Sequence, residues 1–308
     1  MKILIVASYN KSRFAPFIVE QAEALRKKGC SVEFFGLQGK GMKGYLRNLP
    51  SLKRKIKELK PDVVHAHYGL SGLLANLQRR VPVVVTYHGS DINDDKVFRF
   101  SKIAMRLAAC NIFVSKANLQ KANLKKKAAL LPCGISMEDY PLVGRQEARQ
   151  QMHLDAHRRY VLFAGAFDNR VKNAPLAKEA VALIDEVELL ELKGYTRQQV
   201  ALLMQAADAL LMTSFTEGSP QVIKEALACG CPIVSVDVGD VRERTAGVAG
   251  CFVACERTPE CISAWLQQAL AFSGRTNGRE KLIADGLENQ HVAERLMEVY
   301  REVTCVQV

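Results

Sequence analysis

Residues 209–236 have the sequence ALLMTSFTEGSPQVIKEALACGCPIVSV. The apolar runs 209–212 and 232–236 are short and continuous, which is typical of parallel strands that are covered on both faces. Between them, residues 220–229 have the apolar spacing of an amphipathic helix. Two strands joined by a helix in this order form a βαβ unit, which builds a parallel sheet with a right-handed crossover.

The same alternation of strands and helices runs along the rest of the chain. It predicts an α/β fold with two Rossmann-like domains in tandem. In the first half we expect strands at 2–7, 32–35, 62–65, 83–86, 111–114 and 128–131 and helices at 17–28, 51–59, 70–78, 96–109 and 116–125; in the second half we expect strands at 159–164, 187–192, 209–212, 232–236 and 251–254 and helices at 174–183, 197–206, 220–229, 258–271 and 291–303.

A polar segment, Gly134–Asp155, separates the two series. It contains a proline and a glycine and no strand pattern, so we interpret it as a linker. The chain has 308 residues, which is enough for two domains of about 150 residues each. We expect a first domain at 1–143, a second at 144–290, and a C-terminal helix at 291–308 that packs back toward the first domain.

The charge is divided unevenly between the two halves. The net charge is +11, but residues 1–150 carry +16 and residues 151–308 carry −5. A basic half can face nucleic acid, an anionic membrane surface or an acidic substrate. Hydrophobic residues make up 48% of the chain, which excludes a disordered or collagenous protein.

Part of this positive charge lies on the predicted helix 51–59. The cations Lys53, Arg54, Lys55 and Lys57 alternate there with leucine and isoleucine at helical spacing. This pattern fits peripheral docking on anionic lipid, and it fits equally well a solvated face of a helix whose apolar stripe packs in the core. Nucleic acid is not an expected partner, because no recognition motif or aromatic-rich basic groove is present.

The first residues contain only a short apolar run, Ile3–Ala7, and no later stretch is long enough to span a membrane. We therefore expect a cytoplasmic protein, with the inner face of the cell membrane as a site of peripheral association. The nine cysteines are an odd number without a CxxC pair, so we expect reduced thiols and no metal site.

The loop before the predicted helix 220–229 is the first candidate site. Ser219 can cap this helix and Pro220 suits its first position, so backbone N–H groups and the positive end of the helix dipole are available to an anion. Glu217 and Glu225 lie on either side of that anion site, where carboxylates would contact neutral hydroxyls such as those of a sugar and a ribose. Solvated acids at the start of a helix are the alternative reading.

Four segments in the same order resemble the family 4 retaining glycosyltransferases of the GT-B superfamily (glycosyl transferases group 1). Glu217 and Glu225 form the E-x7-E pair of the donor site, and Val85–Asp91 is similar to the family's T-x-H-G-x-D segment. Leu131–Ile135 resembles its P-N-G-V turn, with Cys133 in place of the usual asparagine, and 168–173 resembles its basic diphosphate loop. The resemblance implies the GT-B architecture, two Rossmann-like domains with an interdomain cleft, the first binding the acceptor and the second the donor.

The resemblance also implies roles for residues on the donor side. Lys172 would pair with the donor diphosphate, with Arg170 as a second candidate, and Glu225 would accept hydrogen bonds from the ribose. Glu217 would contact hydroxyls of the donor sugar, and residues 194–197 would contact the base. The donor-binding residues implied in this way are Gly165, Arg170, Lys172, Tyr195, Gly218, Ser219, Pro220, Gln221 and Glu225.

On the first domain, the resemblance places His88 against the donor sugar. Together with Glu217 and Lys172 it forms the implied catalytic set. Asp91 would brace the turn that carries His88 or lie on the acceptor side. The family's Gly-Gly pair after the first strand is absent, and the loop there carries Lys11 and Arg13, which suit a phosphate on the acceptor.

The expected reaction is transfer of a sugar from a nucleotide diphosphate to an acceptor hydroxyl, with retention at the anomeric carbon. No metal or other cofactor is required in this family. A UDP-sugar is the expected donor, although the sequence does not separate uracil from guanine as the base. A glycan or a polyprenyl-linked sugar is the expected acceptor, in surface polysaccharide biosynthesis. A non-catalytic nucleotide-sugar-binding protein and a sugar-nucleotide 2-epimerase are the alternatives; a dinucleotide-dependent dehydrogenase is disfavoured because no G-x-G-x-x-G follows the first strand.

Overall fold

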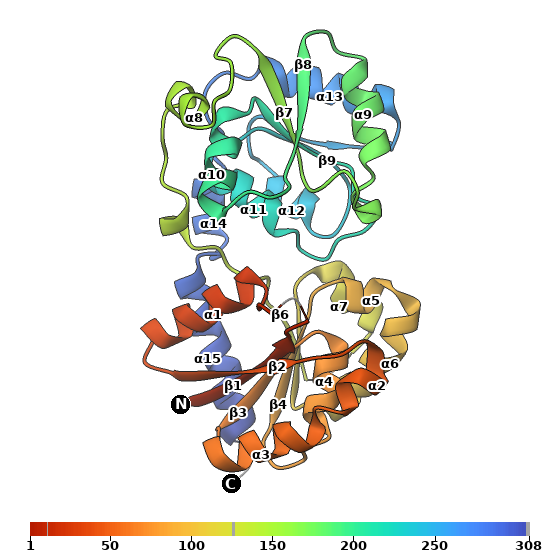
Figure 1. The fold of residues 1–308 in the computed structure, drawn as a ribbon, viewed down its shortest axis with the longest axis vertical. Helices are drawn as coiled ribbons and strands as arrows, with labels where there is room; N and C mark the ends of the chain where they lie inside the picture. The colour runs from red at the N-terminus through yellow and green to blue at the C-terminus, as the bar shows by residue number, and fades with distance from the viewer. Residues whose placement is uncertain (11, 125–126, 306–308) are drawn as a thin grey trace. The chain divides into compact units, whose positions relative to one another are not determined.

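The computed structural model describes residues 1–10, 12–124 and 127–305. The chain divides into two compact units (Figure 1). Unit 1 comprises residues 1–134 and 287–308, and unit 2 comprises residues 135–286. Each unit is built on one parallel β-sheet covered by helices, so the predicted α/β class is confirmed.

Unit 1 contains a six-stranded sheet in the order β2-β1-β3-β4-β5-β6, and every strand pair is parallel. This order changes direction at β1, as in a doubly wound sheet, where ligands bind at the carboxyl ends of the strands. The strands are β1 (Lys2–Ser8), β2 (Ser31–Leu37), β3 (Val63–His67), β4 (Val83–Tyr87), β5 (Cys110–Phe113) and β6 (Ala128–Leu130); the helices are α1 (Pro16–Lys27), α2 (Gly41–Leu46), α3 (Leu49–Leu59), α4 (Gly69–Asn76), α5 (Ser90–Asn93), α6 (Asp95–Leu107), α7 (Lys116–Ala122) and α15 (Asn289–Cys305).

Alternate residues of β1 enter two hydrophobic cores on opposite faces of this sheet. Ile3 and Ile5 pack with residues of α1 and of the C-terminal helix α15, including Tyr300. Leu4 and Val6 pack with α3, α4 and α6 on the other face. The period of two along the strand therefore separates the helices into two layers, with α1 and α15 in the same layer.

Unit 2 contains a five-stranded parallel sheet in the order β11-β10-β9-β7-β8. Its loops at the carboxyl ends of β7 and β9 carry most of the predicted donor residues, and Tyr195 follows β8. The strands are β7 (Arg159–Phe163), β8 (Val187–Glu191), β9 (Ala209–Met212), β10 (Ile233–Val236) and β11 (Cys251–Ala254); the helices are η1 (Met137–Asp139), α8 (Arg145–Gln151), η2 (Arg170–Lys172), α9 (Ala174–Ala182), α10 (Arg197–Ala206), α11 (Gln221–Ala228), α12 (Val241–Thr245), α13 (Pro259–Ala271) and α14 (Gly278–Ala284).

The segment interpreted as a linker is partly helical. It contains α8, and Arg149 of this helix is buried. Its guanidinium donates to the Asp208 carboxylate at 2.9 Å and to the Ala206 carbonyl at 3.0 Å. The linker interpretation was therefore wrong for α8, because buried ion pairing lets a polar sequence pack against a core.

Within the described residues, no helix combines the length and the apolar character that are needed to cross a bilayer.

Candidate active site

The loop before α11 differs from its prediction in how it is capped. The helix begins at Gln221, with Pro220 in the N-cap position and no side chain as cap. The Ser219 hydroxyl instead donates to Asp240 Oδ2, at 2.8 Å, in the loop after β10. The prediction that Ser219 caps the helix was therefore wrong, because its hydroxyl ties the two loops together.

Lys172 and Glu217 form an ion pair in unit 2. The Lys172 Nζ lies 2.7 Å from Glu217 Oε1, and the two side chains are 20% and 16% exposed. The backbone carbonyls of Lys172 and Asn173 both accept from the Thr213 hydroxyl, at 2.9 Å, so η2 is fixed to the end of β9. The structure thus brings together two residues that lie 45 positions apart in the sequence.

Gly165 gives the Lys172 side chain its room. A Cβ atom at Gly165 would lie 2.8 Å from Lys172 Cγ, closer than side chains approach one another. A similar contact fixes the loop before α11, since a Cβ at Gly239 would lie 2.5 Å from the Gly218 carbonyl oxygen. Gly239 also has φ of +60°, where glycine is favoured.

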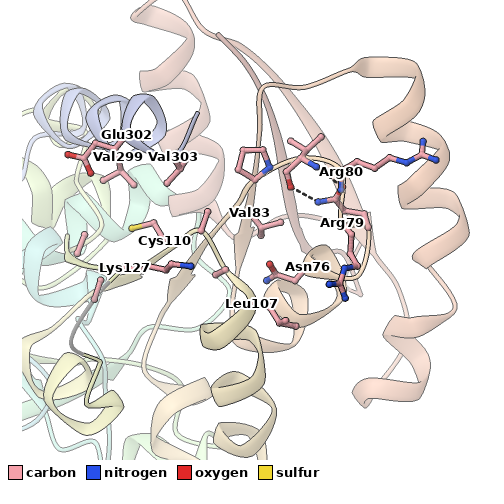
Figure 2. A pocket seen from close by; sticks show the side chains of 17 residues that line it. Asn76, Arg79, Arg80, Val83, Leu107, Cys110, Lys127, Val299, Glu302 and Val303 are labelled. Atoms are coloured by element: carbon pink, nitrogen blue, oxygen red, sulfur yellow. Dashed lines mark hydrogen bonds between the residues drawn. The ribbon is translucent and has the colours of Figure 1, made fainter. Parts of the chain in front are cut away.

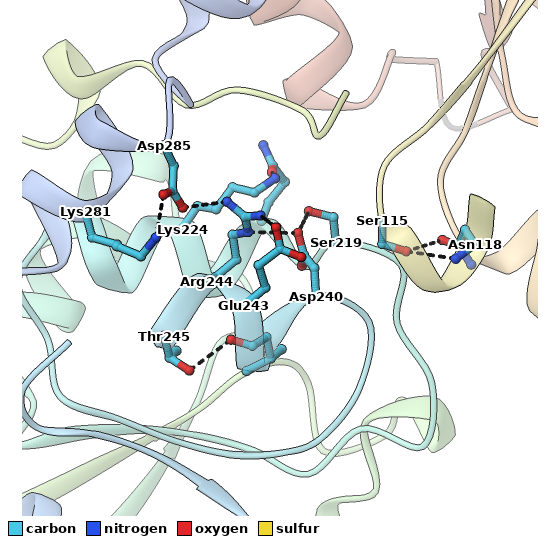
Figure 3. Close-up of polar contacts among 12 residues, drawn as sticks. Ser115, Asn118, Ser219, Lys224, Asp240, Glu243, Arg244, Thr245, Lys281 and Asp285 are labelled. Atoms are coloured by element: carbon cyan, nitrogen blue, oxygen red, sulfur yellow. Dashed lines mark hydrogen bonds and ion pairs between the residues drawn. The ribbon is translucent and has the colours of Figure 1, made fainter. Parts of the chain in front are cut away.

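A buried polar network contacts this loop (Figure 3). The Lys224 side chain is fully buried in α11, and its Nζ donates to Gln221 Oε1 at 2.7 Å. Asp240 pairs with Arg244 at 3.2 Å, and Arg244 also pairs with Asp285 at 2.7 Å. Burial raises the pKa of the Asp240 carboxyl, while the charges of Lys224 and Arg244 oppose that rise.

Sequence reasoning missed Lys224, Asp240 and Arg244. A signal for the first was available, because Lys224 interrupts the apolar run of α11 at a position that the helical spacing places inside. Asp240 and Arg244 could be found only by knowing which loops are in contact, and short-range spacing in the sequence does not give that information.

The remaining donor-side candidates lie on the surface of unit 2. Arg170 is exposed, two residues before Lys172 on η2. Tyr195 is 41% exposed and follows Gly194, which has φ of +82°. Glu225 is half-buried, one turn after Gln221 on α11.

Unit 1 contains a column of three histidines, two on β3 and one directly after the adjacent strand β4. The rings of His65 and His67 on β3 stack with centroids 4.5 Å apart, and those of His67 and His88 stack at 5.3 Å. His67 Nδ1 lies 3.0 Å from His88 Nε2, and His65 bonds the Thr86 and Tyr300 hydroxyls. Burial lowers the pKa of His65 to about 3 and that of His67 well below its usual range, so both rings are neutral.

His88 itself is half-buried at the carboxyl end of β4. The rings of Phe17 and Tyr68 flank it, with centroids at 4.9 and 4.5 Å. The Cys133 Sγ lies 3.7 Å from His88 Nδ1. The residue that replaces the asparagine of the P-N-G-V turn therefore contacts the predicted catalytic histidine.

Asp91 braces the turn that carries His88. Its carboxylate accepts from the backbone N–H groups of Gly69, His88 and Gly89, at 2.9, 3.0 and 3.1 Å. The side chain is 2% exposed, and burial raises its pKa to about 6. Of the other two acceptor-side candidates, Arg13 is exposed in unit 1 and Lys11 lies outside the described residues.

In the described part of the chain, no group of three or more His, Cys, Asp or Glu side chains is arranged to hold a metal ion.

The chain is similar to known glycosyltransferases in both units. Residues 20–139 match Glycosyltransferase Family 4, and residues 161–271 match Glycosyl transferases group 1. TuaC of Bacillus subtilis (strain 168), named for a glycosyltransferase role in teichuronic acid biosynthesis, is 26% identical over 217 residues, which cover 61% of this chain. The match spans 56% of the length of TuaC.

Solved structures show the same fold over the full chain. The sucrose-phosphate synthase of Thermosynechococcus elongatus superposes with a TM-score of 0.88 at 19% identity and covers 100% of both chains. Anabaena HepE in complex with UDP gives a TM-score of 0.78 at 16% identity, with 98% of this chain and 100% of that chain covered. These likenesses confirm the predicted GT-B fold with two Rossmann-like halves.

Proposed function

The chain belongs to the family 4 glycosyltransferases of the GT-B superfamily, and on that premise we propose that it transfers a sugar from a nucleotide diphosphate donor to an acceptor hydroxyl, with retention at the anomeric carbon. The observation that carries this proposal is the Lys172–Glu217 pair beside the start of α11 in unit 2. It combines a half-buried cation, a helix N-terminus and a carboxylate, which are the groups that a sugar diphosphate needs.

Lys172 would change partners when the donor binds. A diphosphate carries more negative charge than a carboxylate, so it competes with Glu217 for the ammonium group. Lys172 and the helix dipole of α11 would then stabilise the charge that grows on the leaving phosphate. Glu217, released from its pair, accepts hydrogen bonds from the donor sugar.

Other donor contacts extend along the same surface of unit 2. We assign Glu225 to the ribose hydroxyls, Tyr195 with its neighbours to the base, and the backbone of residues 218–221 to the diphosphate, while Gly165 leaves room for Lys172. Arg170 is exposed and contributes less than Lys172. A UDP-sugar is the proposed donor, and HepE, which shares the fold, was solved with UDP and with UDP-glucose.

The proposed transfer occurs on one face of the sugar. The bond from the anomeric carbon to the leaving phosphate oxygen breaks, and a bond to the acceptor oxygen forms on the same face. The acceptor proton passes to the leaving phosphate. His88, held by His67 and by the Asp91 turn, donates or accepts hydrogen bonds at the sugar.

The acceptor side belongs to unit 1. Arg13 and Lys11 suit a phosphate on the acceptor, so a glycan or a polyprenyl-linked sugar in surface polysaccharide biosynthesis is the proposed acceptor class. The role named for TuaC supports this class. Unit 1 also carries the positive charge of the chain, which supports a cytoplasmic enzyme at an anionic membrane surface.

The test is a panel of UDP-, GDP- and ADP-sugars, with and without a chelator, measured for binding, hydrolysis and transfer. We expect one donor to bind and turn over in both conditions, and Glu225→Ala to weaken its binding about tenfold or more. If wild type and Glu225→Ala bind every nucleotide equally poorly, the assignment of the donor site is wrong. Binding without turnover would indicate the non-catalytic alternative, and conversion of the free donor without an acceptor would indicate an epimerase.

A further inference from the structure

The helix α6 in unit 1 presents large apolar side chains to solvent. Phe100, Ile103 and Leu107 are 39, 44 and 45% exposed, and their spacing places them on one stripe of the helix. The opposite face of α6 packs in the core, where Phe98 and Met105 are buried. The exposed stripe is therefore additional to what packing requires.

A cation precedes each of these apolar residues. Arg99, Lys102 and Arg106 are all exposed, and none of them forms a salt bridge with another described residue. Lys102 Nζ lies 4.6 Å from the centre of the Phe98 ring. Two parallel stripes, one basic and one apolar, thus run along the outward face of α6, and this is the pattern of a helix that lies in the interface of an anionic membrane.

The apolar stripe ends at a pocket of about 710 Å³ at the amino ends of β4 and β5 (Figure 2). Leu107 lines this pocket, and the exposed cations Arg79, Arg80 and Lys127 also line it. The Gln78 side chain fixes the turn that carries both arginines, because its Oε1 accepts from the backbone of Arg80 and its Nε2 donates to the Val81 carbonyl. One acid, Glu302, lines the pocket beside Val299 and Val303 of α15.

The helix α3 provides a contrast within the same unit. Its cations Lys53, Arg54 and Lys57 are exposed, but its apolar residues Leu52 and Ile56 are buried in the core. The amphipathic pattern of α3 is therefore explained by packing, and α3 offers charge alone. Only α6, of these two helices, combines exposed cations with exposed apolar side chains.

We propose that the outward face of α6 and the rim of the adjacent pocket bind an anionic phospholipid surface, the apolar stripe entering the interface and the arginines contacting lipid phosphates. Charge complementarity favours this occupant, because the stripe is bordered by unpaired cations and unit 1 is strongly basic. The proposal rests on the proposed function for its purpose, which is access to a membrane-linked acceptor, but its geometry is independent of the donor site.

The test is co-sedimentation of the full chain with vesicles of phosphatidylcholine alone and of an equimolar mixture with phosphatidylglycerol. We expect binding only to the anionic vesicles. The variant Arg99→Gln/Lys102→Gln/Arg106→Gln should lose at least about tenfold in partitioning, and Phe100→Ser/Ile103→Ser/Leu107→Ser should lose as much. The matched control Lys53→Gln/Arg54→Gln/Lys57→Gln removes the same charge from α3 and should lose less than about threefold.

Equal losses from the two charge variants, or wild-type binding by the apolar variant, would overturn the proposal. Light scattering without lipid tests whether a second copy of the chain covers this face of α6 instead. The proposal would also be overturned if the wild type is a dimer, the apolar variant is a monomer, and vesicle binding is unchanged. UDP-sugar binding by each variant separates this result from the proposed function. A variant that loses vesicle binding but still binds the donor tests the role of α6 alone. If no donor binds while vesicle binding is intact, only the proposed reaction is contradicted.

Discussion

The polar centres of the two units differ in whether their titratable side chains are paired with an opposite charge. In unit 1, His65 and His67 are buried without a counter-charge, and desolvation keeps them neutral. In unit 2, Lys172 is balanced by Glu217, and Arg244 by Asp240 and Asp285. The difference shows that unit 1 can offer hydrogen bonds of fixed direction, whereas unit 2 can offer charge to an anionic ligand.

The largest effect should come from the charged centre. Lys172→Ala should lower kcat about a thousandfold, because the substitution removes the cation that we propose stabilises the leaving phosphate. Arg170→Ala is the matched control on the same short helix, and it should cost less than about tenfold. Steady-state kinetics with the identified donor measures kcat for both variants. Equal losses would mean that Lys172 has no role that Arg170 does not share.

The neutral centre should give the next largest effect. His88→Ala should lower kcat about a hundredfold, since it removes the group that we propose contacts the donor sugar. His67→Phe keeps a ring in the column but removes the bond to His88 Nε2, and it should lower kcat about tenfold with little change in KM. A rise in KM with kcat unchanged would argue that His67 is only a packing residue.

The neutral histidines should also make unit 1 sensitive to acid. The folded-state pKa of His65 is about 3, below its unfolded value of 6.5, so its contribution to stability is complete above pH 6.5 and is lost as the pH falls toward 3. The free energy of unfolding of wild type minus that of His65→Gln should fall by about 1.5 kcal/mol between pH 6.5 and pH 5.

The wild-type value is compared with that of His65→Gln because Asp91 changes the free energy of unfolding with pH in the opposite direction. Its folded-state pKa is raised to about 6, so it lowers stability as the pH rises from 3.8 toward 6 in both proteins. Denaturant titrations at each pH measure the two free energies. A difference that does not change with pH would show that His65 is not held neutral by burial.

The smallest effect should come from crowding Lys172 rather than removing it. Gly165→Ala places a Cβ 2.8 Å from Lys172 Cγ, which displaces the side chain and should lower kcat about tenfold. Gly144→Ala is the matched control, because nothing lies within 4 Å of a Cβ there. Melting temperatures of both variants, measured beside their kinetics, show whether a loss of activity comes from unfolding.

Most strands and the longer helices could be predicted from the sequence, but several short helices could not. The strands β1 and β9 are continuous apolar runs, and the 13 residues of the helix α13 are enough to show a helical period. The helices α2, α5, α8 and α12 have four to seven residues, which is too few turns for a helical period to appear.

At the candidate site, the sequence suggested residues but not their partners. The resemblance pointed to Lys172, Glu217 and His88, yet it did not reveal that the first two pair with each other or that His67 contacts the third. Ser219 shows the reason. Its sequence neighbours predict a cap, while a residue 21 positions away, Asp240, takes its hydroxyl. Contacts set by tertiary structure override local preference in this way.

The most direct test of the donor assignment is a crystal structure of the protein with UDP bound. We expect the β-phosphate within about 3 Å of Lys172 Nζ and of backbone nitrogens among residues 218–221, with the ribose hydroxyls on Glu225. Glu217 should then have left Lys172. UDP bound at another place, with the 2.7 Å pair between Lys172 and Glu217 intact, would contradict the account.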